Sequence, residues 1–516
     1  MTTEGSPEST EPLFLGIDIG TTGARAVVID PAGRVRAAGA ADYPMHTPRP
    51  LWAEQAPGDW WHGAVVATRQ ALAADGVAAA AISGIGLTGQ MHSTVFLDDR
   101  DRVVRPAILW CDQRTEAECA WISERVGPER LAQIACNPAL TGFSAPKIVW
   151  LRAHEPETFA RVRRVLLPKD YLRFLLTGER ATDVTDASGT LLLDVPRRTW
   201  SGALFDRLEI DPAWLPVVHE SAAVTGTISP AAAEATGLRA GTPVVAGAGD
   251  QAAGAIGNGI VRPGVVSATV GTSGVVFAFA AQPSRDPLGR IHTFCHAIPA
   301  AWHVMGVTLA AGLSLRWFRD TFGLATAAGA SDPYAALAAE AADAGPGADG
   351  LLFLPYLMGE RTPHLDTHAR GVLFGLTSRH CRRHVVRAIL EGVAFSLRDT
   401  LDIFDALGVA ADEVRLSGGG ARSPLWRQIQ ADVFGRRAVV PSTREGPAFG
   451  AALLAAVGTG AFVSAEAACD ATLSIASEVA PDPSTTALYH RLYGIYRELY
   501  PALRPQFRRL AAAVGD

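Results

Sequence analysis

The sequence predicts an α/β protein made of two related halves, each built on a mixed β-sheet. Residues 13–30 read as an apolar strand, the turn Gly20-Thr21-Thr22-Gly23 and a second apolar strand. Residues 265–280 repeat this pattern around Gly271-Thr272-Ser273-Gly274. Hairpins followed by strand–helix units are typical of a mixed sheet. A chain of 516 residues is also too long for one hydrophobic core, which indicates two sizeable domains.

The first half begins with the strands 13–19 and 24–29, a turn at 31–33 and a further strand. A loop at 49–61 leads into a helix expected over residues 60–74, and residues 82–98 read as strand, glycine-rich turn and strand. The stretch between Cys111 and Arg239 is mainly helical and charged. We interpret it as a cap or insertion beside the first core.

The second half follows a glycine-rich stretch in which a strand, a turn at 247–250 and a helix start succeed one another. A strand at 414–421 and an amphipathic helix at 423–435 end its core, and the final stretch reads as helices. We expect a disordered leader at 1–12, an N-terminal domain at 13–262, a C-terminal domain at 263–462 and a helical extension at 463–516.

Charge and cysteine usage exclude several classes of function and indicate a cytoplasmic location. A net charge of −6 gives no general attraction for nucleic acid or anionic membranes. The six cysteines are scattered without metal-type spacing, as in proteins with reduced thiols. The polar N-terminus lacks the pattern of a signal peptide. The most apolar run, 261–281, is broken by Pro263, Gly264 and the second glycine turn, which favours paired strands over a membrane helix.

The two glycine turns are candidate phosphate-binding loops. Glycine lets the backbone approach a ligand closely, and successive N–H groups and hydroxyls can cradle phosphate. One such turn is weak evidence, because plain hairpins also use glycine. A matched pair favours ATP held between the halves. Asp18 stands beside the first turn, where Mg²⁺ on a phosphate needs a hard oxygen ligand.

Three further features have a functional and a plain interpretation. Asp250 follows a strand and precedes a helix, so it is a general base or simply an N-cap. Gly418-Gly419-Gly420 lies between strand and helix, where a ribose or base can lie against the backbone; the alternative is a flexible connection. Gln90-Met91-His92 follows a strand, and lining of a polar pocket and core packing are equally favoured there.

Taken together, these residues resemble the FGGY family of carbohydrate kinases over nearly the whole chain, from about residue 13 to beyond 460. The motifs that carry the resemblance are GIDIGTTGARAV, PLWAEQ, GLTGQMHS, PAILWCDQR, LLPKDYLRFLLTGE, TDVTDASGT, GAGDQAAGAIG, GTSGV, FLPYLMGERTPHLD and LSGGGARSPLWRQIQADV. The resemblance implies a duplicated actin-like, ribonuclease-H-like fold with the active site in the cleft between the domains.

The resemblance also implies a reaction, in which ATP-Mg²⁺ and D-xylulose give D-xylulose 5-phosphate and ADP, and it makes a homodimer plausible. By the same resemblance, Asp250 is the catalytic base and Asp18 the ligand of the metal and phosphates. The remaining implied contacts are Met91, His92 and Gln251 with the sugar, Thr21, Thr22, Gly271 and Thr272 with the phosphates, and Gly419 and Gly420 with the adenosine.

Two departures from the family pattern leave the acceptor open. Familiar members often have Asn where this chain has Gln251, and Gly where it has Ser93. The alternatives are therefore a kinase for another ketose or polyol, such as ribulose, xylitol, arabinitol or glycerol, and, from other classes, an actin-like ATPase switch or a sugar sensor. The loop with Trp52, Glu54 and Gln55 either lies near the sugar, as the resemblance suggests, or is a surface turn.

Overall fold

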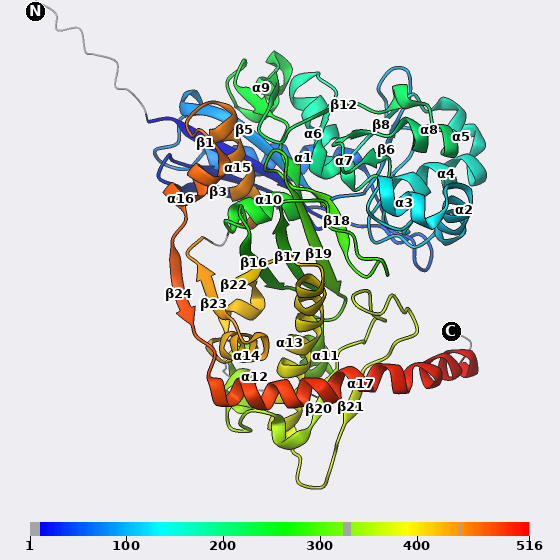
Figure 1. Cartoon of the computed structure of the whole chain (residues 1–516). Helices are drawn as coiled ribbons and strands as arrows, with labels where there is room; N and C mark the ends of the chain where they lie inside the picture. The colour runs from blue at the N-terminus through cyan, green and yellow to red at the C-terminus, as the bar shows by residue number, and fades with distance from the viewer. Residues whose placement is uncertain (1–10, 323–331, 444, 515–516) are drawn as a thin grey trace, which may run out of the picture.

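The computed structural model describes residues 11–322, 332–443 and 445–514, so most of the expected leader at 1–12 lies outside the described residues. Two α/β halves lie one above the other in Figure 1, each around a seven-stranded sheet. The first sheet contains β1 (Leu13–Ile19), β2 (Gly23–Ile29), β3 (Val35–Asp42), β5 (Ile82–Gly89), β13 (Val224–Thr227), β14 (Pro243–Val245) and β15 (Ala248–Gly249). Helices α1 (Pro57–Leu72), α6 (Pro168–Thr177) and α9 (Pro230–Thr236) accompany it.

The second sheet contains β16 (Gly264–Val270), β17 (Gly274–Ala280), β18 (His292–Cys295), β19 (Trp302–Thr308), β22 (Ala411–Gly418), β23 (Arg437–Pro441) and β24 (Ile475–Val479). The second half also contains α11 (Gly312–Phe322), α12 (Pro333–Ala342), α13 (Arg382–Ala406), α14 (Pro424–Phe434), α17 (Pro483–Val514), β20 (Leu352–Leu354) and β21 (Val372–Phe374). Helix α13 is buried along most of its length and forms the centre of this core.

The two sheets repeat one topology, which confirms the predicted duplication. In the first, β1 is antiparallel to β2 and parallel to β5, and the order runs β13-β14-β5-β1-β2-β3. In the second, β16 is antiparallel to β17 and parallel to β22, and the matching order is β24-β23-β22-β16-β17-β19. Strand β18 extends the second sheet beyond β19. Equivalent hairpins therefore place the two glycine turns at equivalent sheet positions.

The predicted insertion lies beside the first sheet, at the upper right of Figure 1. It contains α2 (Glu116–Val126), α3 (Pro128–Ile134), α4 (Ser144–His154), α5 (Pro156–Arg161), α7 (Val184–Ser188) and α8 (Gly202–Leu208). It also contains the short strands β8 (Arg164–Leu166), β9 (Ala181–Asp183), β10 (Leu193–Asp194), β11 (Thr199–Trp200) and β12 (Val217–His219). Three short strands from before the predicted insertion, β4 (Glu54–Gln55), β6 (Val95–Leu97) and β7 (Ala107–Ile108), form small two-stranded sheets, and β6 pairs with β8. The sequence missed that β13, within this stretch, pairs with β14 and so belongs to the first sheet.

Two helices join the halves. Helix α10 (Asp250–Gly257) packs against α15 (Gly446–Gly458), and α15 covers β1 and β5 of the first sheet although it follows a strand of the second. Helix α16 (Ala465–Thr472) packs on α15, so the orange segment of Figure 1 lies beside the blue strands. A Cβ atom at Gly86 would lie 1.8 Å from the carbonyl oxygen of Ala451. Only glycine allows this close approach of strand to helix.

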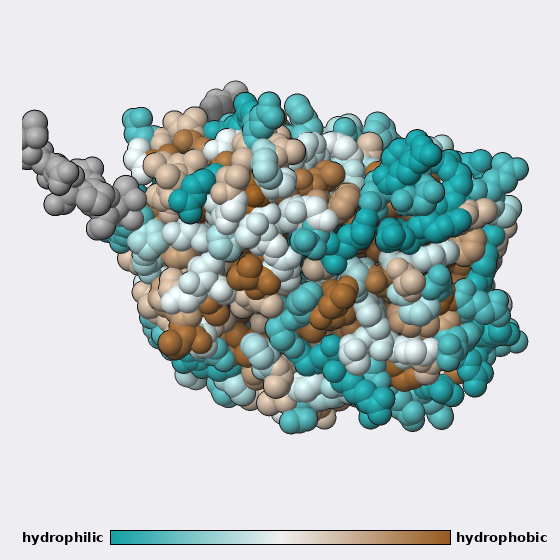
Figure 2. Space-filling model, turned by 90° about the horizontal axis from the view of Figure 1, so that it is seen from above, coloured by the Kyte–Doolittle hydropathy of each residue, from teal (hydrophilic) through white to brown (hydrophobic). Residues whose placement is uncertain are grey.

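The structure tests three local predictions, which concern the helix at 60–74, the final stretch of the chain and the apolar run at 261–281. The helix expected at 60–74 begins at Pro57, because proline suits the first turn, and ends at Leu72. The final stretch contains β24 as well as helices. The apolar run at 261–281 forms the hairpin β16–β17, as predicted, and no helix among the described residues is long and apolar enough to cross a membrane. Figure 2 shows scattered apolar patches on the upper face, with polar side chains between them.

Candidate active site

Asp18 and Asp250 lie at the same end of two strands that flank β5. In the first sheet, Thr88 of β5 pairs with Asp18 of β1 on one side and with Ala248 of β15 on the other. Two strand spacings separate the outer backbones by about 10 Å. Asp250 follows β15 as the first residue of α10, so its carboxylate faces the same end of the sheet as Asp18.

Burial makes both carboxyl groups hold protons more tightly than usual. Desolvation raises the pKa of Asp250 to about 6, although hydrogen bonds from Gln251 oppose the shift. Desolvation and the charge of Asp250 raise the pKa of Asp18 to about 7, against the attraction of Arg25. Desolvation is the larger cause of the raised pKa in both groups. The buried Oδ1 of Asp18 has no hydrogen-bond partner among the described residues and is open to a ligand.

The interpretation of Asp250 as an N-cap is wrong. The N-cap of α10 is Gly249, and Asp250 is the first residue within the helix. Its carboxylate accepts hydrogen bonds from the backbone and from the side chain of Gln251, with 3.4 Å between Nε2 and Oδ1. The backbone of Gly249 is fixed from the insertion, because its N–H donates to Thr185 Oγ1 over 2.9 Å. The Asp250 side chain is thus anchored at its base and available at its tip.

The first glycine turn is held by side chains that the motif did not reveal. Trp110 Nε1 donates to Thr21 Oγ1 over 2.9 Å, and Gln55 Nε2 donates to the Thr21 carbonyl over 2.7 Å. The carbonyl of Gly20 accepts from Tyr43 and from Gln90. Thr22 stays exposed. The turn is therefore rigid at Gly20 and Thr21 and accessible at its tip. Gln55 and Trp110 lie in the motifs PLWAEQ and PAILWCDQR, but their hydrogen bonds to Thr21 are long-range and cannot be read from those motifs.

The second glycine turn borders a cavity of about 560 Å³ in the second half. All four residues assigned to the nucleotide in this half line it, namely Gly271, Thr272, Gly419 and Gly420, together with α11, α12 and the start of α14. Arg316 of α11 donates to Thr272 Oγ1 over 3.1 Å and was not predicted. A guanidinium at a glycine turn provides positive charge where phosphate would lie.

Close packing against β16 accounts for two of the three glycines in the run Gly418–Gly420. The run forms a short 3₁₀ turn rather than a flexible connection. A Cβ at Gly418 would lie 2.5 Å from the Val270 carbonyl oxygen, and one at Gly420 would lie 2.6 Å from the Val270 Cβ. These two glycines therefore serve packing against β16. At Gly419 the nearest atom would be 3.7 Å away, so this is the glycine open to a ligand.

His92 lies where the two halves meet. Its ring packs against Phe143 of the insertion, with centroids 5.0 Å apart, and against Phe294 of β18, 5.9 Å apart. Nδ1 is 2.8 Å from the Gly189 carbonyl oxygen, which can only accept, so Nδ1 carries the proton. Desolvation lowers the pKa of His92 to about 3, so the ring is neutral and Nε2 is an acceptor. Met91 is buried against Gly249, as a packing residue would be.

The two unusual positions and the open loop also have defined places. Ser93 is fully buried; its hydroxyl donates to Gln90 Oε1 and accepts from the Trp110 N–H, so it braces the first turn. Gln251 lies beside Asp250. The interpretation of the Trp52 loop as a surface turn is wrong for Gln55, which is fully buried and also accepts from Trp60 Nε1. Glu54 forms ion pairs with two arginines, Arg105 and Arg114.

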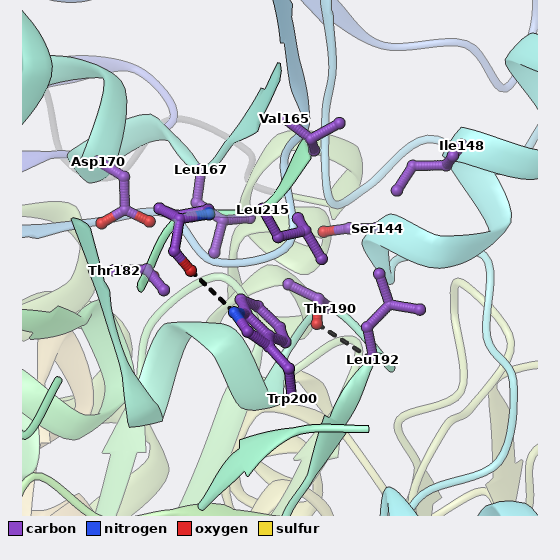
Figure 3. A pocket seen from close by; sticks show the side chains of 11 residues that line it. Ser144, Ile148, Val165, Leu167, Asp170, Thr182, Thr190, Leu192, Trp200 and Leu215 are labelled. Carbon is purple, nitrogen blue, oxygen red and sulfur yellow. Dashed lines mark hydrogen bonds between the residues drawn. The ribbon is translucent and has the colours of Figure 1, made fainter. Parts of the chain in front are cut away.

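A second space, within the insertion, is too small for a substrate. Figure 3 shows Ser144, Thr190 and Trp200 around it, with the Trp200 indole bonded to the Pro216 carbonyl. Its volume is about 10 Å³, which is room for roughly one water molecule. A space of this size holds neither a sugar nor a nucleotide.

Both halves of the chain match the sequence models of one family of kinases. The model of the N-terminal domain of the FGGY family of carbohydrate kinases matches residues 13–257, and that of the C-terminal domain matches 266–459. The chain is 40% identical to the xylulose kinase of Escherichia coli (strain K12), over 96% of this chain and 99% of that protein. It is 39% identical to the xylulose kinase of Bacillus subtilis (strain 168), over 94% and 96% of the two chains.

Solved structures show the same relationship. The crystal structure of a xyloylose kinase from Brucella ovis is 37% identical and superposes with a TM-score of 0.89, covering 96% of this chain and all of that one. The duplicated sheets are thus those of the actin-like, ribonuclease-H-like fold of these kinases. With family matches over both halves and relatives spanning nearly its full length, the chain belongs to the FGGY family of carbohydrate kinases.

Proposed function

We propose that this carbohydrate kinase transfers the γ-phosphoryl group of ATP to the terminal hydroxyl of D-xylulose, giving D-xylulose 5-phosphate and ADP. The choice of acceptor is supported by relatives of about 40% identity that are xylulose kinases. The chemistry is supported by one observation above all: Asp250 is anchored through its backbone, uncapped, and next to a second carboxylate, Asp18. In kinases a positioned carboxylate accepts the proton of the attacking hydroxyl.

Asp250 accepts the proton of the sugar hydroxyl as that oxygen forms its bond to phosphorus and the bond to ADP breaks. A primary hydroxyl is a poor nucleophile, so the proton leaves late in the transfer and the base needs reach more than a high pKa. His92 offers Nε2 as an acceptor for another sugar hydroxyl, since its Nδ1 is committed to Gly189. Gln251, whose amide lies beside Asp250, and Met91, against Gly249, complete the proposed sugar site.

The nucleotide is proposed to occupy the cavity of about 560 Å³ with its phosphates at the glycine turns. Gly419 is open to the adenosine, and Gly420 supports the same wall. Thr272, Gly271 and Arg316 line this cavity, and Thr21 and Thr22 of the first turn are proposed to contact the phosphates from the other half. Phosphates between two such turns would be contacted by both halves, which suits a reaction that must exclude water.

The residues present fit Mg²⁺ bound through its phosphates rather than in a protein cage. The described residues contain no group of three or more His, Cys, Asp or Glu side chains arranged to hold a metal. Asp18, however, offers a buried carboxylate oxygen without a hydrogen-bond partner. Magnesium commonly takes one or two carboxylates plus substrate phosphates. When bound, it offsets charge on the transferring phosphoryl group.

The test is ADP release from ATP-Mg²⁺ with D-xylulose, L-xylulose, both ribuloses, xylitol, arabinitol, glycerol or no sugar. Strong stimulation by D-xylulose over the other acceptors is expected. Preference for another polyol would keep the kinase and change its substrate, and Gln251 would then be the first residue to exchange for Asn. Hydrolysis that ignores every sugar would contradict the proposal.

Two minor parts of the proposal concern the setting of the enzyme. A cytoplasmic location is supported by six cysteines that are all unpaired, as expected for a reducing compartment. A homodimer is supported by the family resemblance, and sedimentation velocity of the purified full chain measures it directly.

A further inference from the structure

Lys147 occupies an unusual position for a cation. Of the 46 basic residues in the chain only two are lysines, Lys147 and Lys169, and both are fully buried. Lys169 is neutralised by the carboxylates of Asp170, Asp183 and Asp186 at 2.6, 3.0 and 3.4 Å. Lys147 has no carboxylate within 4.0 Å among the described residues. Its Nζ donates instead to two backbone carbonyl oxygens, so its role differs from charge neutralisation.

One of those carbonyls belongs to His92. The distance from Lys147 Nζ to His92 O is 2.9 Å, and the same oxygen accepts from Ser144 Oγ at 3.1 Å and from Thr94 Oγ1 at 3.2 Å. His92 has φ = 69°, a left-handed conformation that a residue with a Cβ rarely adopts. Such strain persists only where the surroundings impose it. Three donors converging on one carbonyl impose it here.

The second carbonyl fixes what lies against the His92 ring. Lys147 Nζ is 2.6 Å from Gly142 O, next to Phe143, whose ring packs on the imidazole. Both Lys147 and Ser144 lie in the first turn of α4, and Figure 3 shows Ser144 at the start of that helix. One ammonium therefore ties together the backbone of His92 and the loop that carries its ring neighbour. On the other side, the ring donates to Gly189 O.

From this geometry we infer that Lys147, assisted by Ser144 and Thr94, is a positioning residue that holds His92 in its left-handed conformation and thereby aims Nε2 at a hydroxyl of the sugar. The inference rests on the proposed function, because it assigns His92 to the acceptor site. A compact ammonium suits this place, since a planar guanidinium needs more room and directs its donors in a fixed fork.

Protonation of Lys147 is not what matters. Desolvation lowers the pKa of Lys147 to about 7, opposed by Asp112. A neutral amine still has two N–H groups for its two carbonyl acceptors. The hold of Lys147 on the two carbonyl oxygens, called the clamp below, therefore depends on geometry. It operates at pH values above and below 7.

The test compares wild type with Lys147→Met, which keeps the length of the side chain and removes its donors. We expect the KM for D-xylulose to rise roughly ten- to hundredfold, the loss typical of leaving a buried hydrogen-bonding group without its partner. The KM for ATP should change less than about twofold, because the lining of the nucleotide cavity does not include Lys147. An equal rise in both constants would indicate a general structural role and overturn the inference.

A double-mutant cycle sharpens this comparison. If Lys147 acts through His92, Lys147→Met should have little further effect on kcat/KM in a His92→Ala background. A full, additive loss in that background would contradict the inference. Should Lys147→Met fail to fold, the pair Ser144→Ala with Thr94→Val removes the other two donors, and an unchanged KM for D-xylulose in that variant would also count against the clamp.

A readout without turnover separates this inference from the proposed function. Nitrogen-15 NMR of labelled histidine, assigned with His92→Ala, reports which ring nitrogen of His92 carries the proton. The wild type should show the Nδ1–H form alone, and Lys147→Met, or the Ser144/Thr94 pair, a mixture. If the wild type phosphorylates no sugar, the proposed function fails and this spectrum still decides about the clamp: an unchanged tautomer in the variants overturns it.

Discussion

The hydroxyl of Thr185 accepts a hydrogen bond of 2.9 Å from the backbone N–H of Gly249, the residue directly before Asp250. Thr185 belongs to α7, a short helix whose N-cap, Asp183, also accepts from the Thr185 hydroxyl at 2.7 Å. The carbonyl of Gly189, just beyond α7, accepts from His92. One helical turn in the insertion thus fixes the proposed base and the proposed sugar ligand relative to each other.

This relationship predicts that Thr185→Val lowers kcat. The change keeps the side-chain volume but leaves the buried Gly249 N–H without an acceptor, at a cost of about 1–3 kcal/mol. The backbone at Asp250 is expected to move to relieve part of that cost, which displaces the carboxylate from the hydroxyl it must reach. We therefore expect kcat to fall roughly ten- to hundredfold. Thr185→Ser keeps the acceptor and should retain most activity. Steady-state kinetics of both variants is the measurement, and equal kcat values would contradict the anchoring role.

Removing the proposed base should abolish turnover without loss of the nucleotide. Asp250→Asn keeps the shape of the side chain and its neighbour Gln251 but cannot accept the hydroxyl proton, so kcat should fall by about 10²–10⁴-fold. ADP affinity, measured by calorimetry, should stay within about twofold, because Asp250 is not among the residues lining the nucleotide cavity. A variant that turns over D-xylulose at the wild-type rate would remove Asp250 from this role.

Asp18 is predicted to act through magnesium rather than through the sugar. Asp18→Asn removes one hard oxygen ligand, and the Mg²⁺ concentration that gives half-maximal activity should rise roughly tenfold. Saturating Mg²⁺ should recover part of the activity. Thr22→Ala, at the exposed tip of the neighbouring turn, is the matched control and should weaken ATP binding without shifting the magnesium requirement. Full activity of Asp18→Asn at limiting Mg²⁺ would contradict a metal role.

Much of this site could be predicted because its signals are local. A glycine turn between two apolar strands encodes a hairpin within about ten residues, and Asp18 stands next to such a turn. Asp250 lies where a strand meets a helix, which is also a local signal. The bonds that position them are long-range. Trp110 reaches Thr21 across 89 positions of the chain. Nothing near a lone tryptophan reveals such a partner, so sequence patterns identify reactive groups better than the side chains that hold them.

Two of the elements that the sequence missed are short edge strands. Strands β13 and β24 lie at equivalent ends of the two sheets, and most of their side chains are partly or fully exposed. The alternation of buried and exposed residues that identifies a strand is weak there. In the run Gly418–Gly420, a Cβ at Gly418 or at Gly420 would meet Val270, although Gly420 also lines the cavity. A glycine in a sequence indicates that another group lies close to the backbone, but it does not show whether that group is a ligand or another part of the protein.

The raised pKa values predict an acid limb in the rate profile. Asp250 must be ionised to accept a proton, and its pKa is about 6, so kcat/KM for D-xylulose should fall tenfold per pH unit below that value. Asp18→Asn should leave this limb near pH 6, because desolvation is what raises the pKa of Asp250. Activity that stays flat down to pH 5 would show that no buried carboxyl has to ionise.

The same shifts predict how stability depends on pH. The folded protein binds protons at Asp18 and Asp250 more tightly than the unfolded chain does, whose carboxyl pKa is 3.8. Their contribution is therefore most favourable below about pH 4 and is lost as the pH rises through 6 and 7. Asp250→Asn should consequently gain thermal stability over wild type at pH 8, and lose that advantage at pH 4. Melting curves at both pH values measure this difference.

The close contact between the halves predicts that Gly86→Ala is strongly destabilising. The new Cβ would lie 1.8 Å from the Ala451 carbonyl oxygen, on a backbone that cannot yield without shifting α15 from β5. Overpacking of this kind costs about 1–3 kcal/mol or more. The control is Gly494→Ala in α17, where a Cβ meets nothing within 4 Å and the helix should gain about 0.5–1 kcal/mol. Denaturant unfolding compares the two. Equal stability of both variants would mean that β5 and α15 separate easily. It would contradict a tight contact between the halves at Gly86.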